Sequence, residues 1–169
     1  SGCAWFGKDK PEKPAQQLVE EGVRDYDRGH FKDALESFQQ LRDWYPFSKY
    51  AILAELRIAD AHYQLKEYPE AVTAYEEFER LHPRNEAIAY VIYQIGQCHF
   101  EQIDTIDRDQ TSARKAMEAF QRLIRQYPQD PYAKKASGHL VACIQSLAGN
   151  EYYVGQFSYT RKYYKAALY

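Results

Sequence analysis

The chain has 169 residues, of which 45% are hydrophobic, and its formal net charge is −2. This composition is sufficient for one domain core, but it lacks the basic excess that nucleic-acid binding requires, so no nucleic-acid partner is expected. No apolar run approaches the roughly 18 residues that cross a bilayer. No phosphate-binding loop, nucleophile elbow or catalytic carboxylate pair is evident, so the sequence argues against an enzyme and predicts no cofactor.

The amino-terminal segment, residues 1–14, is expected to be a tether. Residues 8–14 are charged and contain two prolines, which favours an extended linker over a packed element. Ser1 and Gly2 precede Cys3, and small residues before a cysteine resemble the lipobox at which bacterial lipoproteins are acylated. Cys3 is therefore the candidate lipidation site. The alternative is that Ser1 and Gly2 are not native and that Cys3 has no function.

Four residue types recur along the chain at a spacing of 37 residues. A small residue is followed after 12 residues by alanine, after 4 more by an aromatic residue and after 8 more by proline. The first two sets are Gly22, Ala34, Phe38 and Pro46, then Ala59, Ala71, Tyr75 and Pro83. A small residue lets two helices approach closely, so the pattern predicts stacked helical hairpins. Gly29 and Lys66 fall where the first helix of each hairpin must end, and glycine suits a left-handed cap there.

The third repeat keeps this order but contains an insertion. Its residues are Gly96, Ala116, Phe120 and Pro128, with eight extra residues between the first two. The extra residues lie within residues 101–111, and Thr111 or Ser112 offers an N-cap for the helix that follows. Insertions in helical repeat arrays form loops on one face, so we expect a loop here.

A fourth register begins at Gly155 and reaches Ala167, again 12 residues apart. The segment before it, residues 131–150, is longer than its counterparts and is predicted to be additional helix. The apolar residues that share one face of this helix are Leu140, Ile144 and Leu147. The chain ends inside the fourth repeat, so we interpret it as a fragment of a longer protein.

The spacing within each unit resembles the tetratricopeptide repeat (TPR), whose usual period is 34 residues. The resemblance implies an all-α fold, a solenoid of helical hairpins in a right-handed superhelix with about three and a half repeats. The expected bounds are about 15–46, 49–83, 87–128 and 131–169, the last with an extended helix and a truncated end.

The cysteines, histidines and aspartates do not indicate a metal site. Cys98 and Cys143 fall in helical segments, where free cysteine behaves as a small hydrophobic residue. The five histidines form no H-x-x-x-H pattern and no C-x-x-C is present, which argues against zinc. Asp104, Asp107 and Asp109 lack the glycine and terminal glutamate of an EF-hand loop, so we expect a solvated loop without calcium.

The segments that link these repeats carry a more specific resemblance. Residues 42–50, 80–83, 89–93, 107–109, 113–114 and 123–128 look like the BamD lipoprotein family of the outer-membrane β-barrel assembly machinery. The insertion in the third repeat and the long helix before the fourth also resemble that family, over about residues 15–169. The resemblance implies an outer-membrane lipoprotein on the periplasmic face, anchored by palmitate at Cys3. It implies as partners the barrel-bearing subunit, accessory lipoproteins and unfolded outer-membrane protein peptides.

In TPR arrays the first helix of each hairpin lines a concave groove, which is the candidate binding surface. The predicted groove residues are Tyr26, Asp60, Tyr63, Gln64, Tyr90, Tyr93, Gln97 and Phe100. Aromatic faces supply apolar contact at low entropic cost, and amide or carboxylate groups can hold a peptide backbone. This combination suits an extended peptide.

Two alternatives remain open from the sequence. The three groove aromatics that lie 37 residues apart could pack between helices, whereas Tyr90, Tyr93 and Gln97 are expected to be exposed because the repeat pattern does not need them. For function, the first hypothesis is a module that binds aromatic-ended segments of unfolded outer-membrane proteins. The second is a scaffold whose convex face or edge docks other subunits, or a generic TPR scaffold of the cell envelope unrelated to barrel assembly.

Overall fold

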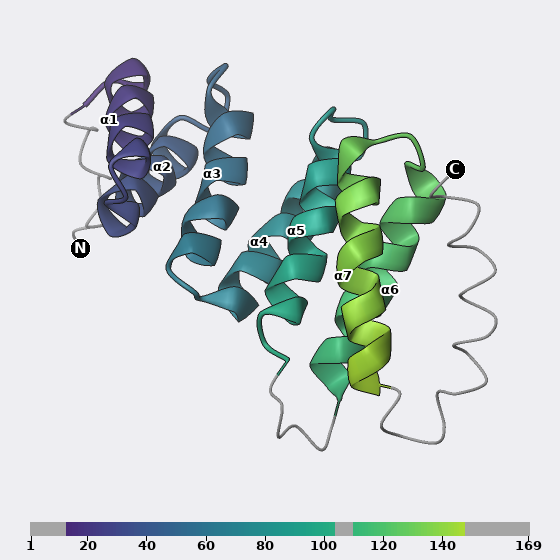
Figure 1. Ribbon diagram of the computed structural model, residues 1–169. Coiled ribbons are helices and arrows are strands. Elements are labelled where there is room, and N and C mark those ends of the chain that lie inside the picture. Colours follow the sequence, from purple (N-terminus) through teal and green to yellow (C-terminus); the bar gives the residue numbers. More distant parts are fainter. Residues whose placement is uncertain (1–12, 104–109, 148–169) are drawn as a thin grey trace, which may run out of the picture. The chain divides into compact units, whose positions relative to one another are not determined.

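The computed structural model describes residues 13–103 and 110–147, and every regular element within those ranges is a helix (Figure 1). The helices are α1 (Ala15–Asp27), α2 (Phe31–Trp44), α3 (Ala51–Gln64), α4 (Tyr68–Leu81), α5 (Ile88–Phe100), α6 (Thr111–Gln126) and α7 (Pro131–Leu147). The predicted all-α fold is confirmed for this part of the chain. The chain divides into two compact units, Ser1–Ala61 and His62–Tyr169, with the border inside α3.

In the first unit, α1 and α2 pack against each other as a hairpin. The residues that the two helices bury are Leu18, Val19, Gly22, Ala34, Phe38 and Leu41. A Cβ atom placed on Gly22 would lie 2.7 Å from the ring of Phe38. Only a residue without a side chain permits this approach, so the prediction that the small residue brings the two helices together is confirmed.

In the second unit, α5 packs against α4, α6 and α7, and α6 also packs against α7 (Figure 1). Nine of the 13 residues of α5 are buried, because this helix has neighbours on several sides. A Cβ atom on Gly96 would overlap the ring of Phe120, which repeats the arrangement of the first hairpin. The guanidinium of Arg122 on α6 binds both carboxylate oxygens of Glu79 on α4.

The helices α2, α4 and α6 end in the same way. The pairs that follow them are Tyr45-Pro46, His82-Pro83 and Tyr127-Pro128. The first residue of each pair donates its backbone N–H to the carbonyl four residues earlier, and the proline cannot continue the helix. Each loop also contains a side chain that accepts a hydrogen bond from the backbone N–H two residues later. The acceptors are Ser48, Asn85 and Asp130, and the donors are the N–H groups of Tyr50, Ala87 and Tyr132, at 3.2, 2.9 and 2.8 Å. The three loops, which we call the interrepeat loops (residues 45–50, 82–87 and 127–130), therefore share one hydrogen-bond pattern.

The turns that follow α1 and α3 each contain a residue in the left-handed region. Gly29 has φ of 79° and Lys66 has φ of 61°, so the predicted left-handed caps are confirmed at both positions. In each turn the N–H of the following residue, His30 or Glu67, reaches back five residues to a helix carbonyl, at 2.8 and 2.9 Å. Lys66 adopts this conformation although its Cβ disfavours it.

The predicted N-cap of α6 is wrong. Thr111 and Ser112 are the first two residues of the helix itself, and the N-cap position is Gln110, with φ of 47°. Among the described residues, no side-chain hydrogen bond from the N-cap position caps this end of α6.

Several expectations lie outside the described residues. These are residues 1–12 of the tether, with Cys3, the aspartates 104, 107 and 109, and the fourth register from Gly155 onward. The long helix before that register is present as α7, and the three apolar residues predicted to share a face, Leu140, Ile144 and Leu147, are all buried. In the ranges 13–103 and 110–147, no helix has the length and apolarity needed to cross a membrane.

Candidate functional site

In the first unit, two predicted groove residues are linked through Arg57. Tyr26 is half-buried, and its ring meets that of Phe31 edge to face, with centroids 5.2 Å apart. The Arg57 guanidinium lies 5.3 Å from the centre of the Tyr26 ring and 3.0 Å from a carboxylate oxygen of Asp60. Asp60 is only 2% exposed, so its carboxylate neutralises Arg57 and is not open to solvent.

In the second unit, Tyr63 repeats the packing of Tyr26. Its ring meets that of Tyr68, the first residue of α4, at 5.7 Å. Burial raises the pKa of Tyr63 to about 12, and the negative charge of Glu101 adds to the effect. The pKa of Tyr68 is raised for the same two reasons, burial first. Both phenols therefore stay protonated hydrogen-bond donors at neutral pH, whereas the neighbouring Gln64 is exposed.

Tyr93 is not exposed, contrary to the sequence expectation. Its exposed fraction is 9%, and its hydroxyl shares a 3.1 Å hydrogen bond with Nε2 of His139. The ring packs 6.0 Å from Phe120 and 5.2 Å from Tyr132. Burial, with Tyr132 adding to it, raises the pKa of Tyr93, and burial lowers the pKa of His139 although Glu101 acts against that shift. The prediction failed because α7 covers this part of α5.

Tyr90 and Phe100 are half-buried at the two ends of the same face of α5. The ring of Tyr90 lies 5.3 Å from Tyr132, and the ring of Phe100 lies 5.0 Å from His139. Tyr132 and His139 come from α7 and were missed by sequence reasoning. Their spacing of seven residues, which places two side chains on one helix face, is the signal that could have found them.

Gln97 lies on the same face of α5, between Tyr93 and Phe100 at helical spacing. Its side-chain oxygen is buried and accepts no hydrogen bond within the part of the chain that the structure describes. A buried acceptor without a donor costs about 1–3 kcal/mol. Gln97 as a whole is half-buried, so a rotation of its side chain would bring this oxygen to the surface, where the donor of a ligand can reach it.

The remaining candidates for chemistry are structural. Cys98 and Cys143 are free and buried, as predicted, and burial raises the pKa of each thiol to about 12. His99 is half-buried, and burial, followed by the positive charge of Lys115, lowers its pKa. The described residues contain no group of three or more His, Cys, Asp or Glu side chains that could hold a metal ion.

Helical hairpins closed by a small residue under an aromatic ring, with proline after each second helix, define a TPR-like helical repeat protein. Solved structures confirm this class. The first TPR of Spaghetti (RPAP3) bound to an HSP90 peptide is similar with a TM-score of 0.60 and 18% identity, over 84% of this chain and 99% of that chain. The NMR structure of the first TPR domain of human RPAP3 is similar with a TM-score of 0.59 and 20% identity, over 81% of this chain and 94% of that chain. At these identities the likeness shows the fold alone.

The family is shown by sequence. The model of YfiO, an outer membrane lipoprotein family, matches residues 11–169, and this chain belongs to that family. Several curated relatives are named outer membrane protein assembly factor BamD. The relative from Caulobacter vibrioides is 31% identical, and the match covers 93% of this chain and 53% of the relative. The relative from Neisseria gonorrhoeae is 30% identical, and the match covers 99% of this chain and 68% of the relative. The Vibrio cholerae relative is 28% identical over 99% and 73%. The chain thus spans from about half to about three quarters of the length of these relatives.

Proposed function

We propose that this chain is the amino-terminal TPR part of an outer-membrane lipoprotein that assists the assembly of β-barrel proteins. Its family and the names of its relatives support this role. The protein works without catalysis, at the periplasmic face of the membrane, and a lipid on Cys3 holds it there. The lipidation proposal rests on the small residues before Cys3 and on the lipoprotein family.

The proposed activity is the binding of an extended, aromatic-ended segment of an unfolded outer-membrane protein. The observation that carries it is the side-chain oxygen of Gln97, which has no donor among the described residues, on a face of α5 that also bears the half-buried rings of Tyr90 and Phe100. A backbone N–H of an extended peptide would satisfy this oxygen, while the rings would contact the peptide's apolar side chains. Tyr93 is buried against α7 through its bond to His139, so its part in this proposal is to position α5 beside α7.

The other predicted groove residues have separate parts in this proposal. In the second unit, Tyr63 offers a protonated hydroxyl as a donor, and the exposed Gln64 offers an amide. In the first unit, Tyr26 presents its ring, and Asp60 acts indirectly by holding Arg57 beside that ring.

The test is the affinity for a fluorescent peptide that has the sequence of a β-barrel C-terminus and ends in an aromatic residue. Gln97→Leu keeps the size of the side chain and removes the acceptor. We expect it to weaken binding about tenfold, the equivalent of one charge-neutral hydrogen bond of about 1.4 kcal/mol. The free energy of unfolding should be unchanged or higher, because the buried unpaired oxygen is removed.

The matched control is Gln145→Leu, the same substitution at an exposed position of α7. It should leave the affinity for the peptide unchanged. Equal binding by wild type and Gln97→Leu would remove Gln97 from the binding surface, and no saturable binding by wild type would reject the peptide-binding role.

A second candidate function is the docking of other assembly subunits outside this face. Leu81 and Val141, which are 46% and 48% exposed in the second unit, favour it. The Val141→Ser variant distinguishes the two functions, because subunit docking would weaken while peptide affinity stayed the same. The barrel-bearing subunit and the accessory lipoproteins are the proposed partners.

A further inference from the structure

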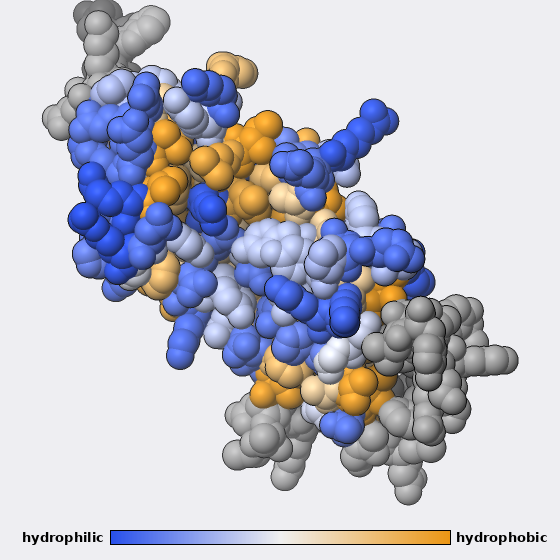
Figure 2. Space-filling model, turned by 45° about the horizontal axis from the view of Figure 1, so that its top comes forward, coloured by the Kyte–Doolittle hydropathy of each residue, from blue (hydrophilic) through white to orange (hydrophobic). Residues whose placement is uncertain are grey.

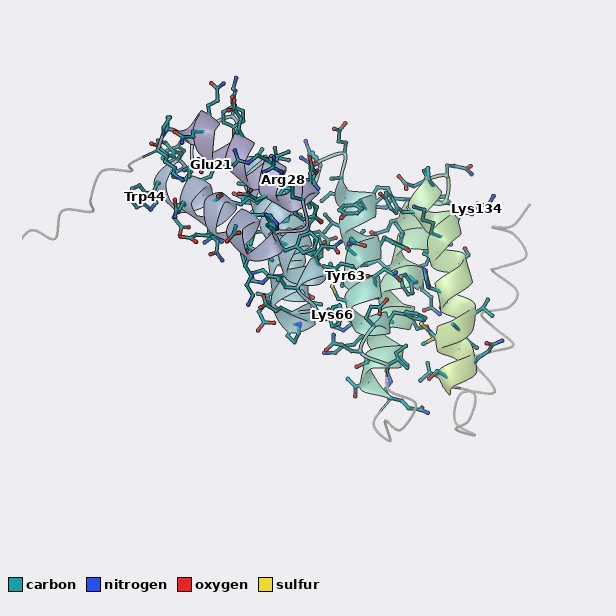
Figure 3. All side chains as sticks on the ribbon, turned by 60° about the vertical axis from the view of Figure 1, so that its left-hand side comes forward. Glu21, Arg28, Trp44, Tyr63, Lys66 and Lys134 are labelled. Atoms are coloured by element: carbon teal, nitrogen blue, oxygen red, sulfur yellow. The ribbon has the colours of Figure 1, made fainter. Side chains whose placement is uncertain are left out.

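The first interrepeat loop presents aromatic surface that the fold does not cover. Phe47 is 99% exposed, and Trp44, the last residue of α2, is 43% exposed. Figure 3 shows Trp44 at the edge of the first unit. Figure 2 shows, for the face that it draws, that apolar surface (orange) lies among hydrophilic surface (blue). Two neighbouring aromatic side chains left in water mark a surface that gains free energy when a partner covers it.

The backbone of this loop does not require either aromatic residue. The other two interrepeat loops have the same hydrogen bonds and the same side-chain cap. At the position of Phe47 they carry Arg84 and Gln129, and at the position of Trp44 they carry Leu81 and Gln126. The exposed aromatic pair is therefore particular to the first loop and is not a consequence of the turn.

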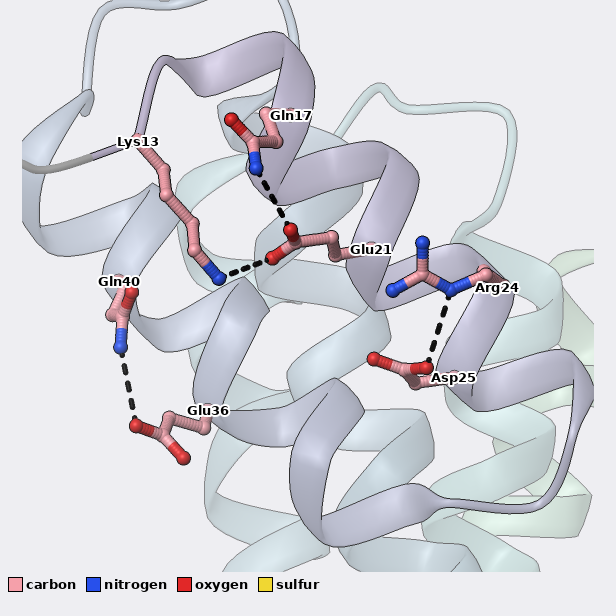
Figure 4. Close-up of polar contacts among 7 residues, drawn as sticks. All are labelled: Lys13, Gln17, Glu21, Arg24, Asp25, Glu36 and Gln40. Atoms are coloured by element: carbon pink, nitrogen blue, oxygen red, sulfur yellow. Dashed lines mark hydrogen bonds and ion pairs between the residues drawn. The ribbon is translucent and has the colours of Figure 1, made fainter.

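The chain enters the first unit against this loop. The hydroxyl of Tyr45, between the two aromatic residues, donates a 2.9 Å hydrogen bond to the backbone carbonyl of Lys13. The Lys13 ammonium lies 2.7 Å from a carboxylate oxygen of Glu21 on α1 (Figure 4). Hydrogen bonds from Lys13 and Gln17 lower the pKa of this carboxyl group. Lys13 is thus held at both its backbone and its side chain. Nine residues, 4–12, lie between Cys3 and Lys13, and this part of the chain spans at most about 35 Å.

One positive charge beside the loop suits a surface of anionic groups. Lys49 lies beside Phe47 in the sequence and is exposed, with its ammonium 5.0 Å from the centre of the Tyr50 ring. Arg42, in the last turn of α2, is balanced by Asp43 at 2.7 Å, so Lys49 supplies the net positive charge of residues 42–50. Aromatic residues flanked by lysine or arginine are typical of the lipid–water interface, where rings enter the apolar boundary and cations face phosphates.

We propose that Trp44 and Phe47 insert into the interface of the membrane that carries the amino terminus, with Lys49 against anionic headgroups. The inference rests on the proposed lipid anchor at Cys3. A lipid surface, and not a peptide, is the occupant because the loop adjoins the segment that leads to Cys3. The contact gives the anchored protein a second attachment, which fixes the orientation of its first unit relative to the bilayer.

The experiment uses the whole chain coupled through Cys3 to vesicles of phosphatidylethanolamine and phosphatidylglycerol (3:1) that contain a maleimide lipid. Cys98 and Cys143 are buried and protonated, so coupling is selective. Trp5→Phe leaves Trp44 as the single tryptophan. We expect dibrominated lipids to quench at least half of its fluorescence, and Phe47→Ser to reduce that quenching at least twofold.

The matched control moves the reporter to the second interrepeat loop. In a Trp5→Phe, Trp44→Phe, Leu81→Trp variant, the tryptophan occupies the equivalent position of a loop that carries Arg84 in place of Phe47. It should be quenched several-fold less than Trp44. Helicity by circular dichroism checks that each variant is folded.

Three outcomes would overturn the inference: no quenching of Trp44, equal quenching with Phe47→Ser, or equal quenching of the Leu81→Trp reporter. Quenching that an aromatic-ended peptide abolishes would assign the loop to peptide binding instead. The anchor itself is tested separately, by the mass of the amino-terminal peptide from membrane-extracted protein. An unmodified Cys3 would reject the proposed lipidation and leave the vesicle result interpretable.

Discussion

The first hairpin, α1–α2, and the third, α5–α6, use the same contact but differ in how much of their first helix is buried. Gly22 lies against Phe38 in one and Gly96 against Phe120 in the other. Three residues of α1 are buried, whereas nine residues of α5 are. The difference shows that the contact between paired helices is local to each hairpin. The burial of the remaining faces depends on neighbouring helices, which for α5 are α4 and α7 as well as α6.

The largest expected effect comes from closing the space that both glycines leave. Gly96→Ala and Gly22→Ala each place a methyl group within the van der Waals distance of a phenylalanine ring. We expect each to lower the free energy of unfolding by about 2 kcal/mol, the cost of overpacking less the helix propensity that alanine gains. Urea unfolding followed by circular dichroism measures it.

A double-mutant cycle makes this prediction specific. In a Phe120→Leu background the ring is absent, so Gly96→Ala should be neutral or stabilising by up to about 1 kcal/mol. If Gly96→Ala costs the same in both backgrounds, the loss does not come from contact with Phe120, and the proposed likeness of the two hairpins fails.

The sequence predicts the features that the two hairpins share more successfully than those in which they differ. Gly22 and Phe38 lie on the two helices of one hairpin, so the repeat pattern predicts their contact without information about helices outside that hairpin. The burial of Tyr93 could not be predicted, because it depends on Tyr132 and His139 of α7. The repeat pattern assigns both residues only to a long helix.

The candidate site shows the same division. The sequence placed Tyr90, Tyr93, Gln97 and Phe100 on one helix, which the structure confirms as α5, whereas the lack of a donor for the Gln97 oxygen among the described residues depends on side-chain packing. The caps Ser48, Asn85 and Asp130 were missed although each is a known turn former and each stands two residues after proline. Here the signal was local, so the sequence was sufficient to find them.

The second prediction concerns the loops that follow the two hairpins. Asp130→Ala removes the acceptor for the N–H of Tyr132 and should lower the free energy of unfolding by about 1 kcal/mol. Ser48→Ala, after the first hairpin, should cost less because its hydrogen bond is longer, 3.2 Å compared with 2.8 Å. Thermal unfolding of both variants measures the difference.

Asp130→Asn is the control, since asparagine keeps the acceptor oxygen and should be nearly neutral. If Asp130→Ala and Asp130→Asn are equally destabilising, the charge of Asp130 matters and the cap hydrogen bond does not. The three interrepeat loops would then be alike in geometry but not in the interaction that stabilises them.

The smallest effect is expected at the turns that follow α1 and α3, where one conformation is adopted by two different residues. Lys66→Gly removes the cost of a side chain at φ of 61° and adds the entropy of glycine in the unfolded chain, for a net stabilisation of about 0.5 kcal/mol. Gly29→Lys should have the opposite sign and a similar size. No atom lies within 4 Å of a Cβ at Gly29, so only the backbone conformation opposes the substitution. If Lys66→Gly destabilises the protein, contacts of the Lys66 side chain outweigh its strain, and the two turns differ in energy although they share a backbone.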